Sequence, residues 1–291
     1  MGAHGRRPRR GIRAGARPRA GRRALRLSLS RPEAPRRIAT VLFDFGDTLA
    51  RVHPSIPGHY RAALAGHGID ASPASVRRAL RRAGDRYRVV VRSGVRIESD
   101  RAAAAAFWRS YNETLLAALG VRRARRGLAA ALAEGFYAPT SWRRFPETTA
   151  VLRQLRAEGV AVGIVSNFTP ALLSLGDALG LTALCQVVLA STLVGSEKPD
   201  ASIFRLALRR LGADPRTTIH VGDTYATDVL GARGAGITPV LVARRDRRPR
   251  LSAGDGEPPA PLPSRLDCAV VSDLVGVLAI VRATPGSASL E

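Results

Sequence analysis

The sequence predicts an α/β protein with a doubly wound parallel sheet and an all-helical domain inserted after the first strand. Six short apolar runs occur along the chain, and a helical pattern follows almost every one of them after a short loop. This alternation is typical of a parallel sheet with helices on both faces. The runs are continuously apolar, as expected for strands that are covered on both sides. Residues 57–144 break the alternation with long helical patterns and no convincing strand pair.

The predicted strands and helices follow from these patterns in chain order. The strands are 39–44, 160–166, 185–190, 217–222, 238–243 and 268–271. Helical spacing of apolar residues predicts helices over 147–158, 170–179, 201–211, 225–235 and 273–282, and over 101–119 and 123–134 within the inserted segment. We therefore divide the chain into an α/β core of residues 38–56 and 145–291 and a helical domain of residues 57–144.

Two segments contain too little apolar material to fold. Residues 1–37 hold 13 Arg and one acid among many Gly, Ala and Pro residues, and we expect a disordered tail. Two interpretations of this tail stay open: a segment that binds nucleic acid or another acidic surface, or a dispensable or wrongly assigned start. Residues 244–267 are charged and rich in Pro and Gly, and are interpreted as a flexible surface loop.

The net charge of +23 is unevenly distributed. The tail carries +12, and residues 57–144 carry +11 from 17 Arg and six acids, so the rest of the chain is balanced. No apolar run reaches the roughly 18 residues needed to cross a bilayer. The two cysteines, Cys185 and Cys268, provide no disulfide framework. We expect a soluble cytoplasmic protein, monomeric or homodimeric.

Polar residues gather where four of the predicted strands end. In a doubly wound sheet, ligands bind beyond the carboxyl ends of the strands. The chain places there Asp44, Gly46, Asp47 and Thr48, then Ser166 and Asn167, then Lys198, and finally Asp223 and Asp228. Lys198 is the only lysine beside 45 arginines. The sequence therefore predicts a reaction centre at this edge of the sheet, where Asp44 finds cation and hydrogen-bond partners.

In this order, the four motifs resemble those of the haloacid dehalogenase superfamily of hydrolases. They are FDFGDTL (43–49), VSN (165–167), KPD (198–200) and GDTYATD (222–228), and the resemblance covers roughly residues 38–282. It implies a Rossmann-like core, and residues 57–144 stand where that family carries its first type of cap, an α-helical one.

The resemblance also implies a role for each site residue. Asp44 would be the nucleophile that forms an aspartyl phosphate, and Lys198 would hold Asp44 and the phosphoryl oxygens. Ser166 and the backbone N–H of Asn167 would donate hydrogen bonds to the phosphoryl group. A Mg²⁺ ion would sit on the carboxylates of Asp44 and Asp223 and the carbonyl of Gly46, with Asp228 as a direct ligand or a support.

The sequence departs from the family pattern at one position. Most phosphatases of the family carry an acid/base aspartate two residues after the nucleophile, and this position here is Gly46. The carboxylate stands one residue later, at Asp47, where those enzymes usually have glycine. Three interpretations stay open: Asp47 turns into the site, water or a cap residue moves the proton, or the activity is weak.

These residues imply a magnesium-dependent phosphatase acting on a small phosphorylated metabolite. Two alternatives remain: a metal-independent 2-haloacid dehalogenase, and a catalytically weak binding or regulatory protein with a basic tail. The remaining candidate side chains have simpler interpretations. His220 is interpreted as a core or supporting histidine, and Phe107, Trp108 and Tyr111 as the core of the cap. The basic cap either attracts anionic substrates or is a solvated face.

Overall fold

The computed structural model describes residues 2, 37–121, 127–244 and 266–283. The predicted tail lies outside these residues except for Gly2 and Arg37, and so does most of the loop predicted at 244–267. Within these ranges, every helix and strand lies between Thr40 and Ala283.

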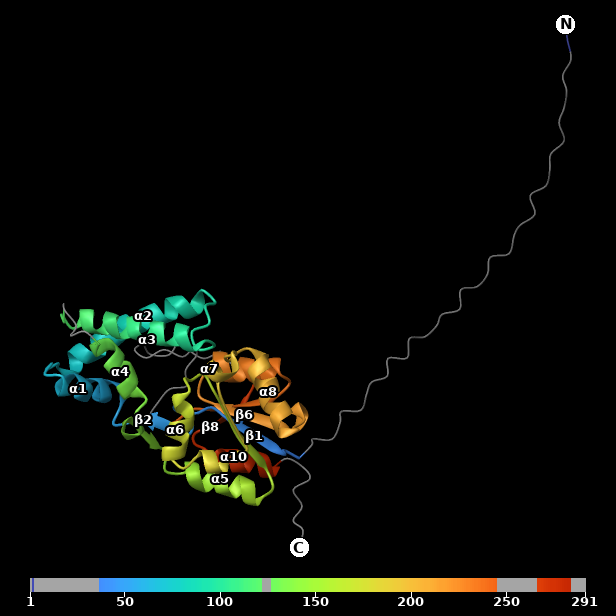
Figure 1. Ribbon diagram of the computed structural model, residues 1–291. Coiled ribbons are helices and arrows are strands. Elements are labelled where there is room, and N and C mark those ends of the chain that lie inside the picture. The colour runs from blue at the N-terminus through green and yellow to red at the C-terminus, as the bar shows by residue number, and fades with distance from the viewer. Residues whose placement is uncertain (1, 3–36, 122–126, 245–265, 284–291) are drawn as a thin grey trace. The chain divides into compact units, whose positions relative to one another are not determined.

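A parallel sheet forms the core, as predicted (Figure 1). In the described residues it has six strands in the order β5-β4-β1-β6-β7-β8. Their bounds are β1 Thr40–Phe43, β4 Ala161–Ser166, β5 Val187–Ala190, β6 Thr218–Gly222, β7 Thr238–Val242 and β8 Ala269–Val271. Each lies within one of the predicted strands. The first strand pairs with β4 on one side and β6 on the other, which puts the end of β1 at the centre of the sheet.

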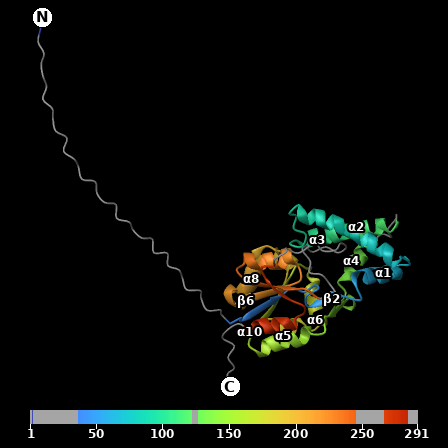
Figure 2. The same cartoon turned by 180° about the vertical axis from the view of Figure 1, so that it is seen from behind.

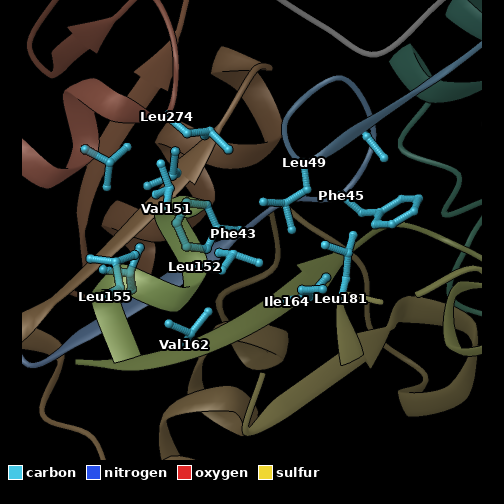
Figure 3. Packing of buried hydrophobic residues seen from close by; sticks show 14 of the residues in the cluster. Phe43, Phe45, Leu49, Val151, Leu152, Leu155, Val162, Ile164, Leu181 and Leu274 are labelled. Carbon is cyan, nitrogen blue, oxygen red and sulfur yellow. The ribbon is translucent and has the colours of Figure 1, made fainter. Parts of the chain in front are cut away.

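Helices cover both faces of the sheet, so the doubly wound fold class is confirmed. One face packs against α5 (Thr148–Ala157), α6 (Ala171–Ala178) and α10 (Val275–Ala283), and the other against α8 (Ala201–Leu211) and α9 (Leu230–Gly234). Alternate residues of β1 serve the two faces: Phe43 packs with α5 and Leu42 with α8. Figure 3 shows Leu152 and Leu155 of α5 beside Phe43 and Val162. Shorter pieces complete the core: η2 (Thr182–Leu184), α7 (Ser191–Val194), η3 (Pro215–Thr217) and the π-helix η4 (Tyr225–Val229).

Residues 56–136 form the helical cap, which has its own apolar core. Its helices are α1 (Ile56–Gly66), α2 (Pro73–Arg92), α3 (Arg101–Ala118) and α4 (Leu128–Phe136). Leu64, Leu80, Leu115 and Leu132, one from each helix, are buried together. The cap appears as the blue-green group of helices in Figures 1 and 2. Within the described ranges, no helix is long and apolar enough to cross a membrane.

Two short strands at the base of the cap were not predicted. β2 (Ala50–Val52) pairs antiparallel with β3 (Trp142–Arg144), which follows η1 (Pro139–Ser141). Each has three residues, too few to show an alternating pattern, and 89 residues separate them. Because the two strands carry the chain out of the core and back, their pairing fixes where the cap begins and ends.

Candidate active site

Asp44 lies one residue beyond the central strand β1 and is buried. Its backbone N–H donates to the carbonyl of Val221 at 2.9 Å, which continues the pairing with β6 past the end of β1. Its side chain keeps only 10% of its surface exposed. A carboxylate in this position is costly unless cations or hydrogen-bond donors compensate it.

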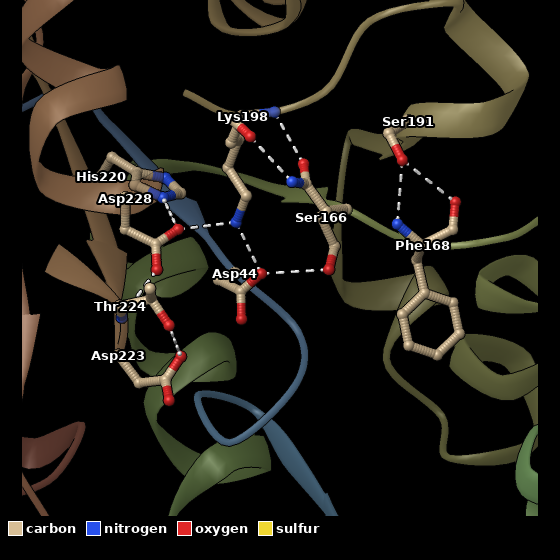
Figure 4. A network of polar contacts seen from close by, with 10 residues as sticks. Asp44, Ser166, Phe168, Ser191, Lys198, His220, Asp223, Thr224 and Asp228 are labelled. Carbon is tan, nitrogen blue, oxygen red and sulfur yellow. Dashed lines mark hydrogen bonds and ion pairs between the residues drawn. The ribbon is translucent and has the colours of Figure 1, made fainter. Parts of the chain in front are cut away.

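Lys198 supplies this compensation and links two carboxylates (Figure 4). Its Nζ lies 2.6 Å from Oδ1 of Asp44 and 2.6 Å from Oδ1 of Asp228. The Lys198 side chain is 2% exposed, so all three charges interact away from water. Burial would lower the pKa of Lys198, but Asp228 and Asp44 outweigh this effect and raise it, so the lysine stays charged.

The two carboxylates that share Lys198 titrate differently. Burial raises the pKa of Asp44 and outweighs the opposite effect of Lys198. Burial acts on Asp228 in the same direction, but Lys198 and His220 hold its pKa below the ordinary value. One ammonium therefore serves two buried carboxylates, and burial leaves the predicted nucleophile Asp44 with a raised pKa.

Ser166 and Asn167 reach the site from the end of β4. The hydroxyl of Ser166 donates to Oδ1 of Asp44 at 3.0 Å. The Asn167 side chain contacts the Lys198 backbone twice: it donates to the carbonyl at 2.8 Å and accepts from the N–H at 2.7 Å. The sequence predicted only the backbone N–H of Asn167 as a functional group, and this side-chain clamp on the lysine was missed.

Asp228 is held on every side. Its Oδ1 contacts Lys198 and, at 3.0 Å, Nε2 of His220, while its Oδ2 accepts the backbone N–H of Thr224 at 2.9 Å. A Cβ on Gly222 would lie 2.2 Å from the Asp228 carboxyl carbon, so only glycine allows this approach. His220 is fully buried, and burial lowers its pKa, which leaves it as a neutral hydrogen-bond partner. Asp228 is therefore placed to position Lys198.

Asp223 and Gly46 face the same cavity as Asp44 and are suited to a hard cation. Asp223 is half-buried and accepts a hydrogen bond from Thr224 Oγ1 at 3.2 Å. In the described part of the chain, no group of three or more His, Cys, Asp or Glu side chains is placed to hold a metal ion. The groups available to a metal ion are the carboxylates of Asp44 and Asp223 and the backbone carbonyl of Gly46. Mg²⁺ prefers oxygen ligands of this kind and usually keeps several water molecules as well.

The charges around the cavity also favour a bound cation. Its described lining contains the four aspartates Asp44, Asp47, Asp223 and Asp228, but Lys198 as the one basic residue. An additional positive ion would reduce this imbalance. The donor set and the charge therefore both fit a divalent ion.

Asp47 lies in the turn after the nucleophile and lines the same cavity. Its φ angle is 57°, a left-handed conformation that favours glycine but that Asp tolerates better than most residues. Glycine at this position would adopt the same conformation without steric cost. Asp47 is half-buried, and its N–H donates to the carbonyl of Ala50 at 2.7 Å.

The cavity measures about 180 Å³, and aromatic side chains from both domains form most of its apolar part. They are Tyr87, Trp108, Tyr111, Phe136, Trp142 and Phe168. Trp108 and Tyr111 also pack on one another in the cap, as predicted, but their position beside the cavity was missed. The cap arginines are absent from the described lining; on α2, Arg77, Arg81 and Arg86 are exposed instead. They form a solvated face.

Comparisons with known proteins agree with the fold and with the family that the sequence resembles. The family model for haloacid dehalogenase-like hydrolases matches residues 38–236. A mouse protein, haloacid dehalogenase-like hydrolase domain-containing protein 3, is 30% identical over 204 residues, covering 69% of this chain and 80% of its own. A glyceraldehyde 3-phosphate phosphatase from Methanothermobacter thermautotrophicus is 39% identical over 101 residues, or 34% of this chain and 45% of its own.

A solved structure supports the fold alone. The L-2-haloacid dehalogenase from Xanthobacter autotrophicus, with chloropropionic acid covalently bound, matches with a TM-score of 0.59 at 20% identity, covering 84% of this chain and 99% of that one. The family model extends over well more than half of the chain. The chain therefore belongs to the haloacid dehalogenase-like hydrolase family, and it is a hydrolase.

Proposed function

We propose that this hydrolase is a magnesium-dependent phosphatase acting on a small phosphorylated metabolite, with Asp44 as the nucleophile. The arrangement of Asp44 carries the proposal: a buried carboxylate at the end of the central strand, paired with Lys198, beside a cavity rich in acids. The phosphatase activity in the name of the similar archaeal protein supports the reaction class.

Each residue around Asp44 has a part in this chemistry. The free electron pairs of the Asp44 carboxylate attack phosphorus, and an aspartyl phosphate forms as the ester oxygen leaves. Lys198 neutralises charge on Asp44 and on the phosphoryl oxygens through charge-assisted hydrogen bonds. Ser166 orients Asp44, and the Asn167 side chain holds Lys198 in place. The Ser166 hydroxyl and the Asn167 backbone N–H are the proposed donors to the phosphoryl group.

Mg²⁺ would be held by the carboxylates of Asp44 and Asp223 and the carbonyl of Gly46. When bound, it would supply positive charge that lets a carboxylate approach a phosphate dianion. Asp228 would support the site through Lys198, because its two oxygens already accept hydrogen bonds from Lys198 and Thr224.

The cavity limits the substrate. Its volume of about 180 Å³ suits a small ester, and its aromatic walls suit an organic part with apolar surface. Because Lys198 is the one cation in the described lining, a second anionic group on the substrate would find no arginine there. We propose a phosphomonoester with one charged phosphoryl group.

Turnover of p-nitrophenyl phosphate tests the proposed function. We expect hydrolysis that requires Mg²⁺, stops in EDTA, and is lost in Asp44→Asn. Glu113→Gln, an exposed change on α3, is the matched control and keeps full activity. Turnover that persists in EDTA or in Asp44→Asn would rule the proposal out.

The same preparation separates the two alternative functions. Halide release from a 2-haloacid without phosphatase activity would indicate a dehalogenase. The described cavity lining offers such a substrate's carboxylate one cation, Lys198, which already pairs with Asp44 and Asp228. Salt-sensitive binding of nucleic acid that needs residues 1–37, without turnover of any ester, would indicate a binding protein.

A further inference from the structure

The proposed reaction needs a proton for the departing ester oxygen, and Gly46 has no side chain to supply it. The indole of Trp142 covers that side of the backbone: its Cη2 lies 3.9 Å from the place a Cβ on Gly46 would take. Another group facing the cavity must therefore provide the proton.

Glu98 is the cap carboxyl that faces this cavity. It stands between α2 and α3, and it lines the cavity together with Asp44 and Lys198. It also lines an adjoining cavity of about 440 Å³ that shares Asn167 and Lys198 with the first. Glu98 thus stands where the reaction space meets a second hollow through which water can exchange protons with it.

The direction of the reaction favours a group on the cap. In an in-line displacement, the leaving oxygen departs on the side of phosphorus opposite the attacking atom. Asp44 attacks from the end of the core sheet, so the leaving group points away from the core. Glu98 belongs to the cap and lines the same cavity as Asp44.

Two contacts fix the Glu98 segment against the loop that carries Lys198. The backbone N–H of Glu98 donates to the carboxylate of Glu197. Two residues earlier, Arg96 forms an ion pair with Asp200 at 2.6 Å. Glu197 and Asp200 flank Lys198 in the sequence, so the backbone at Glu98 is attached to the same short loop that carries Lys198.

The surroundings of Glu98 favour its protonated form at neutral pH. Burial raises the pKa of Glu98 to about 8, and the neighbouring Glu197 acts in the same direction. Lys198 opposes this shift and Asp44 adds to it. Burial raises the pKa of the nearby Tyr137 as well, so that phenol stays neutral. A carboxyl that keeps its proton near neutral pH has the pKa that general acid catalysis requires.

An indole donor lies beside Glu98. The Trp108 side chain acts as a hydrogen-bond donor toward the Glu98 carboxyl and lowers its pKa. Its indole Nε1 is buried and has no other hydrogen-bond partner among the described residues. The indole N–H can therefore stabilise the carboxylate that remains after proton transfer.

We propose that Glu98 is the general acid and base of this active site, an inference that rests on the proposed function. As the Asp44 oxygen bonds to phosphorus and the ester P–O bond breaks, the leaving oxygen takes the proton of Glu98 and departs as an alcohol. The Glu98 carboxylate then accepts a proton from the water that attacks the phosphoryl group. The Asp44–phosphorus bond breaks, inorganic phosphate leaves, and Glu98 regains its proton.

A series of aryl phosphates tests this role, because a leaving group that is already acidic needs little protonation. We expect Glu98→Gln to lower kcat/KM about 100-fold or more for phenyl phosphate. For p-nitrophenyl phosphate the loss is below about tenfold, because nitrophenolate departs without a proton. The slope of log(kcat/KM) against leaving-group pKa therefore becomes steeper in the variant.

Two variants and one substrate make the result decisive. Glu113→Gln, the same change on the exposed face of α3, keeps the wild-type slope. Asp47→Asn tests the other carboxylate that could donate the proton. A steeper slope of log(kcat/KM) in Asp47→Asn, together with a wild-type slope in Glu98→Gln, would show that Asp47 is the acid and would overturn the inference. Equal losses on all esters in Glu98→Gln would make Glu98 merely structural and overturn the inference. Wild-type turnover of p-nitrophenyl phosphate shows separately that the proposed function holds.

Discussion

The ammonium of Lys198 lies 2.6 Å from Oδ1 of Asp44, and both side chains are almost entirely withdrawn from water. Lys198 is also 2.6 Å from Asp228, so removing it leaves two buried carboxylates without their cation. We expect Lys198→Met to be inactive and to lose about 3–5 kcal/mol of unfolding free energy in EDTA. Urea unfolding measures this, and a stability within about 1 kcal/mol of wild type would contradict the ion-pair network.

Arginine should not replace Lys198. The compact ammonium fits between Asp44 and Asp228, whereas a guanidinium is wider and planar. We expect Lys198→Arg to keep most of the stability lost in Lys198→Met but to turn over p-nitrophenyl phosphate at least about 100-fold more slowly. Wild-type kinetics in Lys198→Arg would show that charge alone suffices at this position.

Substitutions of Asp223 and Asp228 should have different effects, one on Mg²⁺ binding and the other on the free energy of unfolding. Asp223 is half-buried and is proposed to hold Mg²⁺, so Asp223→Asn should raise the Mg²⁺ concentration for half-maximal activity about tenfold or more, with little loss of stability. Asp228→Asn should instead lower the unfolding free energy, because Asp228 is buried against Lys198. The comparison needs a Mg²⁺ titration and urea unfolding of both variants. Interchanged effects would assign the metal to Asp228.

The turn at Asp47 gives a prediction about backbone conformation. With φ at 57°, position 47 accepts glycine without strain, but alanine there should cost about 1 kcal/mol. We expect Asp47→Gly to match or exceed the stability of Asp47→Ala in thermal unfolding. If Asp47 is not the acid, Asp47→Gly also keeps the wild-type dependence on the leaving group. A less stable glycine variant would contradict the left-handed turn.

The raised pKa of Glu98 predicts a dependence of stability on pH. Between the ordinary value of 4.5 and the folded value of about 8, the folded state binds a proton that the unfolded state has released. Stability therefore falls as pH rises through this range. Glu98→Gln has no such proton, so relative to wild type it should gain thermal stability from pH 5 to pH 8. An unchanged difference between the two proteins would show that Glu98 titrates normally.

Much of the fold was open to prediction because strands covered on both faces are marked by continuous apolar runs. All six runs contain a strand of the sheet, and the polar residues after four of them lie together. Lys198 stood out because the rest of the chain uses arginine. By contrast, β2 and β3 are too short to show a periodic pattern, and they form strands because they pair with one another in the folded chain.

The cap side of the active site could not be predicted for a related reason. Helical spacing shows that Trp108 and Tyr111 lie on the apolar face of α3, but not that this face borders a cavity as well as the cap core. Glu98 lies between two helices in a segment without periodicity, and its environment comes from Glu197, about 100 residues away. Only the folded chain brings these residues together.

The most direct test of the central claim is to look for the phosphoryl group on Asp44. Wild-type protein is mixed with p-nitrophenyl phosphate and Mg²⁺, quenched in acid within one turnover, digested, and analysed by mass spectrometry. We predict phosphate on the peptide that contains Asp44, and none after the same treatment of Asp44→Asn. Rapid turnover with no phosphate on that peptide, or undiminished turnover in Asp44→Asn, would contradict the account.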